Sequence, residues 1–357
     1  MADYTILTIN PGSTSTKIAV YENNKMIFLK QIQHTVSDLE RFSGIIDQYE
    51  FRRDIVLEEL RYADISLDSI HIVVGRGGLL KPVEGGVYRV NDAMLHDIEF
   101  PMAGHVSNLG GYIAYEIAKM IGNGVEAFIA DPTSVDELDD IARISGLPEI
   151  PRRSFLHSLN QKAVARRFAT EKGGKYEDYN LIVAHMGGGI TVGAHKKGRI
   201  VDVNNGLNGD GPFSPERAGG LPSGQLAELC FSGKYTLEEI KKMLTGKGGL
   251  VAYLGTNNAV EIEARIEDGD RDAELILFAM AYQVSKEIGA MYTVLNGEVD
   301  AIILTGGLAF GKIFVDQIIE RVNKLAQVLV FAGEDEMQSL ASNGLMVLKG
   351  EIEAKEW

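Results

Sequence analysis

The chain alternates short apolar segments with polar turns and longer amphipathic stretches. Residues 4–9, 16–22 and 25–32 are rich in β-branched or alternating apolar residues, and short polar turns separate them. This pattern predicts a meander of three strands. Amphipathic periodicity and further apolar runs predict helices near 37–62, 91–99 and 106–121, and strands at 71–74, 86–90 and 125–130.

The second half of the chain repeats the plan of the first half. Residues 181–203 follow the order of residues 6–29, with an apolar strand, a glycine-bearing turn, a second strand, a polar turn and a third strand. Gly12 and Gly187 occupy corresponding turns. A glycine-rich loop at 204–224, helices up to about 296, and further helices and strands follow: strand 300–304, helix 311–324, strand 327–331 and helix 335–349.

This internal duplication predicts an α/β fold with two similar domains and a cleft between them. A length of 357 residues also exceeds what one hydrophobic core usually serves. We expect residues 1–153 plus about 335–357 to form the first domain, and residues 154–334 to form the second.

Composition narrows the classes of partner. A net charge of −15 disfavours nucleic acid and anionic membranes, since both associations use clustered Lys and Arg. The amino terminus carries no signal-peptide pattern and no apolar run reaches membrane-spanning length, so we expect a cytoplasmic protein. The single cysteine, Cys230, fits a reducing compartment and is expected to be buried.

Two turns have the composition of phosphate sites. In NPGSTSTK (10–17), small residues let backbone N–H groups converge on an anion, and hydroxyls and a lysine add donors and charge. In HMGGGIT (185–191), three glycines present backbone amides at the equivalent turn. A polar hairpin turn is the alternative for each motif alone, but the pair predicts a bound polyphosphate.

TGGLAFGK (305–312) follows an apolar strand and precedes a helix. Its spacing approaches that of a P-loop, but Ile313 stands where a magnesium-binding Ser or Thr is required, so a P-loop is excluded. The turn is interpreted as a surface for a nucleoside, and a closely packed helix start is the alternative.

Cations and carboxylates beside other turns fit phosphoryl transfer, which needs positive charge around the moving group. Arg76 and Arg217 lie in glycine- and proline-flanked loops, and solvated surface charge is the alternative for them. Asp131 ends a strand before Pro132, as magnesium carboxylates often do, or caps a helix. Glu336 begins the last helix, where it binds metal or favours the helix dipole.

Together these motifs resemble the acetate and sugar kinase, heat-shock protein 70 and actin superfamily, and within it the acetokinase family. NPGSTSTK is similar to the first phosphate motif of the family, HMGGGIT to the second and TGGLAFG to the adenosine motif. RRSFLHS (152–158) is similar to the stretch that holds the family's active-site histidine. The resemblance is closer to butyrate and branched-chain fatty acid kinases than to acetate kinases.

The resemblance implies two ribonuclease H-like (actin-like ATPase) domains, ATP/ADP and Mg²⁺ as cofactors, and a homodimer or higher homo-oligomer. It implies that the first domain binds the acyl substrate and phosphate, and that the second binds the nucleotide and dimerises. The implied catalytic residues are Arg76, His157, Arg217, Asp131 and Glu336, of which Asp131 and Glu336 hold the metal. The implied nucleotide-binding residues are Asn10, Gly12, Ser13, Thr14, Ser15, Lys17, His185, Gly187, Gly188, Gly189, Gly306, Gly307 and Leu308.

Departures from acetate kinases point to a longer acid. Gly75, Gly104 and Leu156 are smaller than the residues expected there, so a roomier acyl pocket is predicted. The resulting hypothesis is reversible phosphorylation of butyrate by ATP, with branched-chain acids, propionate and acetate as alternatives. An ATPase switch of the actin or chaperone type is the alternative from another class.

Overall fold

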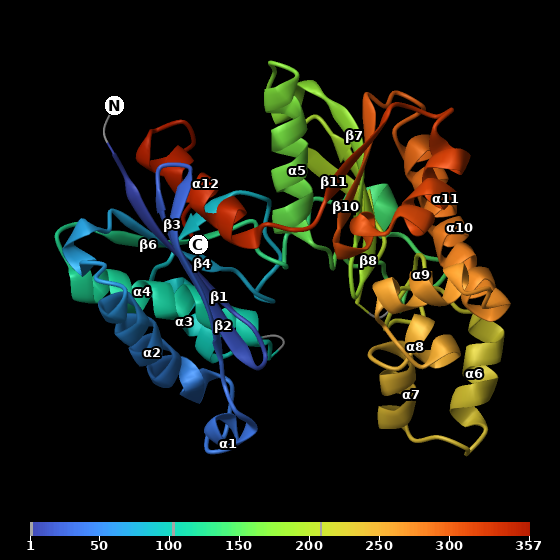
Figure 1. Ribbon diagram of the computed structural model, residues 1–357, viewed down its shortest axis with the longest axis horizontal. Helices are drawn as coiled ribbons and strands as arrows, with labels where there is room; N and C mark the ends of the chain where they lie inside the picture. Colours follow the sequence, from blue (N-terminus) through green and yellow to red (C-terminus); the bar gives the residue numbers. More distant parts are fainter. Residues whose placement is uncertain (1–2, 102–103, 208) are drawn as a thin grey trace. The chain divides into compact units, whose positions relative to one another are not determined.

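The computed structural model describes residues 3–101, 104–207 and 209–357. The chain forms two compact units (Figure 1). The first contains the chain up to Val135 together with Asp335–Trp357, and the second contains Asp136–Glu334.

The first unit is built on a sheet of six strands in the order β3-β2-β1-β4-β6-β5. The first three strands are antiparallel, β4 and β6 run parallel to β1, and β5 closes the edge antiparallel to β6. The strands are β1 Thr5–Pro11, β2 Ser15–Glu22, β3 Lys25–Gln33, β4 Ile72–Arg76, β5 Val87–Arg89 and β6 Glu126–Ala130.

Helices cover both faces of this sheet. Alternate residues of the strands point to opposite faces. Leu7 and Ile9 therefore share a core with α2 and α4, while Ile6 and Val74 pack against Gly344 of α12. The helices of this unit are α1 Val36–Leu39, α2 Tyr49–Tyr62, α3 Asp92–Glu99, α4 Leu109–Ile121 and α12 Glu336–Leu348.

The second unit repeats the arrangement. Its sheet has the order β9-β8-β7-β10-β11, with β7, β8 and β9 antiparallel and with β10 and β11 parallel to β7. This order matches β3-β2-β1-β4-β6, so the predicted duplication of an α/β unit is confirmed. The strands are β7 Asn180–Met186, β8 Ile190–Lys196, β9 Arg199–Val203, β10 Ala301–Gly306 and β11 Val328–Ala332.

The core of the second unit also has two faces. Helices α10 and α11 pack on one face of the sheet, and α5 packs on the other through Val164, Ala165 and Phe168. The helices are α5 Ser158–Glu171, α6 Ser223–Phe231, α7 Leu237–Leu244, α8 Gly249–Leu254, α9 Ala259–Glu267, α10 Arg271–Val294 and α11 Lys312–Val322. Short 3-10 helices lie at Ile46–Gln48, Leu67–Ser69, Val106–Asn108, Asp140–Arg143, Tyr176–Asp178 and Gly307–Phe310.

Some expectations differ from the structure. The helix expected at 37–62 is interrupted, because α1 ends at Leu39 and the Asp47 carboxylate accepts a hydrogen bond from the Gly44 N–H in a turn before α2. Helix α5 was not predicted. Residues 136–153, expected in the first domain, belong to the second compact unit. Arg152 ties them to β9, donating to Asp202 at 2.8 Å and to the Val203 carbonyl at 3.1 Å.

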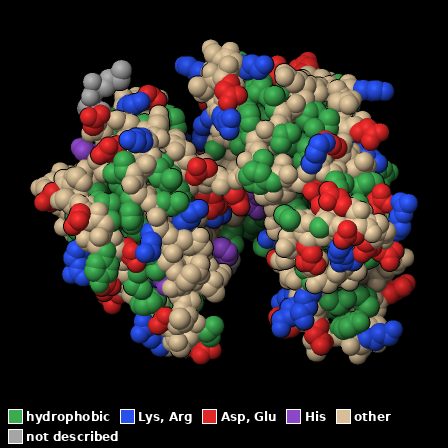
Figure 2. Space-filling model, in the orientation of Figure 1, with side chains coloured by type: hydrophobic (Ala, Val, Ile, Leu, Met, Phe, Trp, Pro, Cys, Tyr) green, Lys and Arg blue, Asp and Glu red, His purple; other side chains and the backbone are tan. Residues whose placement is uncertain are grey.

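The surface mixes charge types. On the face drawn in Figure 2, acidic, basic and hydrophobic side chains are intermixed over both units. Cys230 is exposed on α6, so the expectation that it is buried is wrong. Within residues 3–101, 104–207 and 209–357, the helices are too short or too polar to cross a membrane.

Candidate functional site

The turn between β1 and β2 presents backbone donors to solvent. The Gly12 N–H donates to the Ser15 carbonyl at 2.8 Å and closes the turn. Ser13 and Thr14 are exposed, and their N–H groups have no hydrogen-bond partner in the described part of the chain. Two neighbouring amides that point into solvent form a concavity suited to an anion.

Polar side chains gather beside this turn at the ends of β1, β2 and β4. Asn10 lies opposite Lys17 in the strand register. Arg76, the last residue of β4, forms an ion pair with Glu336 at 2.5 Å and donates to the side-chain Oδ1 of Asn10 at 3.5 Å. Asn10 in turn donates its amide to the second oxygen of Glu336. Burial and the charge of Arg76 lower the pKa of His105 nearby.

Asp131 lies at the same edge of the sheet. It follows Ala130, which pairs with Arg76 in the parallel register of β4 and β6. Its carboxylate is buried and accepts a hydrogen bond from the Gly86 N–H at 2.8 Å, and its own N–H donates to the Gly86 carbonyl. Asp131 therefore has a structural role in this turn, at a φ of 37°.

The contacts of Glu336 and Asp131 indicate how well each carboxylate suits Mg²⁺. Magnesium keeps most of its waters and takes only one or two protein carboxylates. Glu336 meets this demand, because its side chain is 20% exposed and its counter-ion Arg76 also reaches solvent. Asp131 fits as a carboxylate with a fixed orientation, but its burial leaves it less accessible than Glu336.

The turn between β7 and β8 corresponds to the first turn. His185 pairs with Thr191 in the register where Asn10 pairs with Lys17, and the Gly187 N–H donates to the Gly189 carbonyl at 2.9 Å. The N–H groups of Gly188 and Gly189 have no partner within the described residues of this unit.

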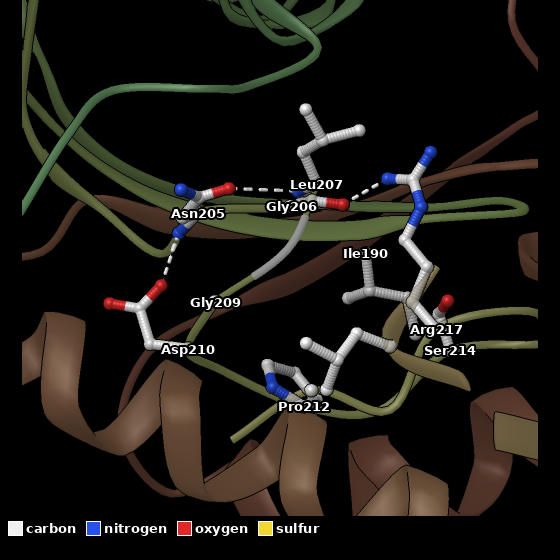
Figure 3. Close-up of a pocket in the computed structure, with 11 residues that line it drawn as sticks. Ile190, Asn205, Gly206, Leu207, Gly209, Asp210, Pro212, Ser214 and Arg217 are labelled. Carbon is white, nitrogen blue, oxygen red and sulfur yellow. Dashed lines mark hydrogen bonds between the residues drawn. The ribbon is translucent and has the colours of Figure 1, made fainter. Parts of the chain in front are cut away.

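Arg217 packs directly on this second turn. A Cβ added at Gly189 would overlap the guanidinium group, so only glycine permits the contact. Arg217 donates to the Gly206 carbonyl, as Figure 3 shows, and burial lowers its pKa. Arg217 and Gly206 line a small pocket. The residues that line it are Ile190, Asn205, Gly206, Leu207, Gly209, Asp210, Pro212, Ser214, Arg217, Gly219 and Leu244. The structure thus joins Gly189 and Arg217, which are distant in sequence.

Two histidines of the second unit stack on one another. The rings of His157 and His185 lie 3.9 Å apart at an angle of 14°. His185 is buried, with Nδ1 2.9 Å from the side-chain Oδ1 of Asn160 and Nε2 3.6 Å from the Glu334 carboxylate. His157, which precedes α5, is partly exposed.

A chain of buried hydrogen bonds links His157 to Tyr176 through Thr191, Gln161 and His195. Gln161 lies between Thr191 and His195. The Thr191 carbonyl can only accept a hydrogen bond, so the Gln161 amide nitrogen must face it, at 3.1 Å. That nitrogen also donates to the Thr191 hydroxyl at 2.8 Å, and the Gln161 oxygen accepts from His195 Nε2 at 2.9 Å. Tyr176 completes the chain by donating to His195 Nδ1 at 2.7 Å.

The polarity of this chain assigns the proton of His157. Thr191 already accepts from Gln161, and within the described residues His157 Nδ1, 3.0 Å away, is the acceptor open to its hydroxyl proton. Nδ1 is therefore unprotonated in the neutral ring, and Nε2 carries the hydrogen.

The turn after β10 depends on close approach of two backbones. Gly306 has a φ of 91°, and a Cβ there would overlap the Met186 carbonyl. Gly307 begins a short 3-10 helix, and the Leu308 side chain is buried in the core of the second unit. Any contact of Leu308 with a nucleoside must use its backbone. Phe310, which the sequence did not single out, is exposed beside this turn.

Two of the three predicted acyl-pocket residues pack closely against neighbouring parts of the chain. A Cβ at Gly75 would overlap the backbone of Gly110, so this glycine lets α4 approach β4. Leu156 is buried in a small core with Leu138 and Ile200. Gly104 is exposed, and a Cβ there would meet only the tip of Ile45 at 3.8 Å.

The sequence analysis did not identify the buried residues that bond the first turn or orient His157. Arg52 bonds the backbone of the first turn, and Gln161 and Thr191 orient His157. Arg52 had a detectable signal, because it shares the buried face of α2 with Val56 and Leu60 at helical spacing.

Comparison with known proteins agrees with this geometry. The sequence model described as the Acetokinase family matches residues 148–348. The fold is similar to a crystal structure of Porphyromonas gingivalis acetate kinase (TM-score 0.78, 18% identity, 97% of this chain and 100% of that chain). It is also similar to a propionate kinase from Francisella tularensis (0.73, 18%, 95% and 98%) and to acetate kinase from Entamoeba histolytica (0.74, 15%, 97% and 98%).

These likenesses show that the two α/β units form an actin-like ATPase fold of the acetate kinase type. The family match spans more than half of the chain and includes the second glycine turn, His157, Arg217 and Glu336. The chain belongs to the acetokinase family.

Proposed function

We propose that this protein transfers the γ-phosphate of ATP to the carboxylate of a short-chain fatty acid, reversibly, with butyrate as the preferred acid. The observation that carries the proposal is the pair of equivalent hairpin turns, each with two open backbone N–H groups. An arginine lies beside each turn, Arg76 at the first and Arg217 at the second. Membership of the acetokinase family and the names of the similar structures, acetate and propionate kinases, support it.

The roles proposed for the site residues follow from their contacts. A fatty acid with a pKa of about 4 to 5 is ionised at neutral pH, so the nucleophile needs no general base. His157 and Arg217 of the second unit, and Arg76 of the first unit, are each proposed to bind oxygens of a phosphoryl group. Lys17 and the open amides of the first turn are proposed to bind phosphate oxygens in the first unit, and the open amides of the second turn are proposed to do the same in the second unit.

Glu336 and Asp131 are the proposed carboxylates for Mg²⁺. When bound, the ion neutralises phosphate oxygens during transfer. The Glu336 carboxylate is held by Arg76 and Asn10, so these two residues orient it toward the end of β4.

The proposed preference for butyrate rests on Gly104 and on the sequence resemblance. The absence of a side chain at Gly104 leaves room beside Ile45. Burial of two further methylenes contributes roughly 1.6 kcal/mol, or about fifteenfold in kcat/KM over acetate. We further propose that the first unit binds the acid, that the second binds the nucleotide, and that the protein is a cytoplasmic homodimer.

The test is acyl phosphate formation, trapped as the hydroxamate, across acids of two to five carbons with Mg-ATP. The proposal expects acid-dependent ADP release with a maximum at butyrate or a branched C4 or C5 acid. A maximum at acetate would refute the chain-length preference. Hydrolysis of ATP that does not depend on any acid would refute the kinase and favour an ATPase switch.

A further inference from the structure

We propose that Arg52 is a buried positive charge that makes the turn at residues 10–17 an anion site. This inference rests on the proposed function only in assigning the turn at residues 10–17 to phosphate binding. Arg52 lies in the first turns of α2 and is 0% exposed. Its side chain reaches the turn from inside the unit, on the side away from solvent.

The guanidinium group binds the carbonyl side of the turn. Its two terminal nitrogens donate to the carbonyls of Gly12 at 3.0 Å, Ser13 at 3.2 Å and Ser15 at 2.9 Å. A further bond reaches the Thr16 hydroxyl at 3.0 Å.

These bonds fix the direction of the open amides. In a trans peptide the C=O and the following N–H point in opposite directions. Because the Gly12 and Ser13 carbonyls point at Arg52, the N–H groups of Ser13 and Thr14 point away from it, toward solvent. Arg52 therefore sets the geometry of the donors that an anion would meet.

The charge of Arg52 has no carboxylate partner among residues 3–101, 104–207 and 209–357. Its remaining bonds go to the neutral Gln48 amide oxygen, at 3.1 Å from Nε and 3.0 Å from a terminal nitrogen. Its neighbour His34 stays neutral above mildly acidic pH, because burial and Arg52 lower the pKa of this histidine to about 4. Buried charges are normally paired, since an unpaired one is costly.

An oxyanion on the outer side of the turn would supply the missing negative charge. The ligand class is a phosphate or polyphosphate, held by two backbone amides and by the field of a cation behind them. Low polarisability of the surroundings strengthens this attraction.

The experiment titrates pyrophosphate and Mg-ATP into the full chain and follows the backbone ¹H–¹⁵N signals of Ser13 and Thr14. In the wild type both signals should shift on titration. In Arg52→Met the dissociation constant should rise at least about tenfold, and Arg52→Lys, which keeps the charge without the fork, should be intermediate. Arg61→Met, on the exposed side of the same helix, is the matched control and should bind as the wild type does.

The outcomes separate this inference from the proposed kinase. Wild-type affinity in folded Arg52→Met would overturn the inference and leave the kinase intact. Shifts of Ser13 and Thr14 without acid phosphorylation would overturn the kinase and keep the anion site. If Arg52→Met does not fold, Gln48→Leu provides the test, because it removes the two hydrogen bonds that Arg52 donates to the Gln48 side-chain oxygen. That variant should weaken pyrophosphate binding several-fold, and unchanged binding would overturn the proposal.

Discussion

At the scale of single residues, side chains beneath the two turns respond to pH and proton position. His34 Nε2 lies 2.8 Å from the Thr16 hydroxyl and the ring lies beside Arg52, with its other nitrogen buried and without a partner in the described residues. The neutral ring is therefore the form that the folded chain accommodates.

The free energy of unfolding should fall as the pH drops from about 6.5 to 4. Burial and Arg52 lower the pKa of His34 to about 4, so in this range the unfolded chain binds a proton that the folded chain does not. The loss is at most about 3 kcal/mol at the acid end. Urea unfolding at pH 7 and 4.5 should show a smaller loss in His34→Gln. His96→Gln, an exposed control, should behave as the wild type does.

Thr191→Val should change the tautomer of His157. Without the hydroxyl donor, Nδ1 of His157 is no longer held unprotonated, so ¹⁵N spectra of the ring should show both neutral tautomers. We expect kcat to fall about tenfold or more, and Thr191→Ser should restore both readings. Thr170→Val, at the exposed end of α5, is the control. A pure Nε2–H ring in Thr191→Val would contradict the assignment.

At the scale of elements, glycines decide how closely helices and strands approach. Gly75 on β4 and Gly110 on α4 face one another, and a Cβ on either would overlap the backbone of the other element. The sequence showed glycines here but not their partners, because a contact between distant segments leaves no local pattern.

Gly75→Ala should destabilise the first unit without changing the acid preference. Forcing β4 and α4 apart should lower the free energy of unfolding by about 1–3 kcal/mol. Gly104→Ala, at an open position, should leave stability within about 0.5 kcal/mol and shift the preference toward shorter acids. Urea unfolding and hydroxamate assays measure the two effects. A stable Gly75→Ala variant that prefers acetate would restore Gly75 to the acyl pocket.

At the scale of the whole molecule, the duplication of the α/β unit could be predicted, because both copies show the same order of apolar strands and polar turns in the sequence. The apolar segments around Gly12 and Gly187 predict the two equivalent hairpins. The position of residues 136–153 in the second compact unit has no local pattern in the sequence, because Arg152 contacts β9 through side-chain bonds. The bonds of Arg52 and Gln161 could not be predicted for the same reason, although the place of Arg52 on the buried face of α2 could.

The two units should differ in their ability to fold alone. Residues 136–334 form one continuous segment with its own core, so this fragment should unfold cooperatively. Residues 1–135 lack α12, whose Gly344 packs on Ile6 and Val74, and should remain largely unfolded. Joining 335–357 by a flexible linker should rescue that fragment. Circular dichroism during heating measures each case, and a cooperatively folded 1–135 would contradict the prediction.

The end of the chain fastens the first unit. The Lys355 N–H donates to the Val87 carbonyl at 2.8 Å, and Trp357 bonds Asp97 and packs edge-on against Tyr88. Residues 335–357 are synthesised after residues 136–334, and they complete the unit that residues 1–135 begin. Since domains usually fold as they emerge, this protein should reverse the common order: residues 136–334 fold first, and residues 1–135 stay exposed to chaperones and proteases until residues 335–357 have emerged.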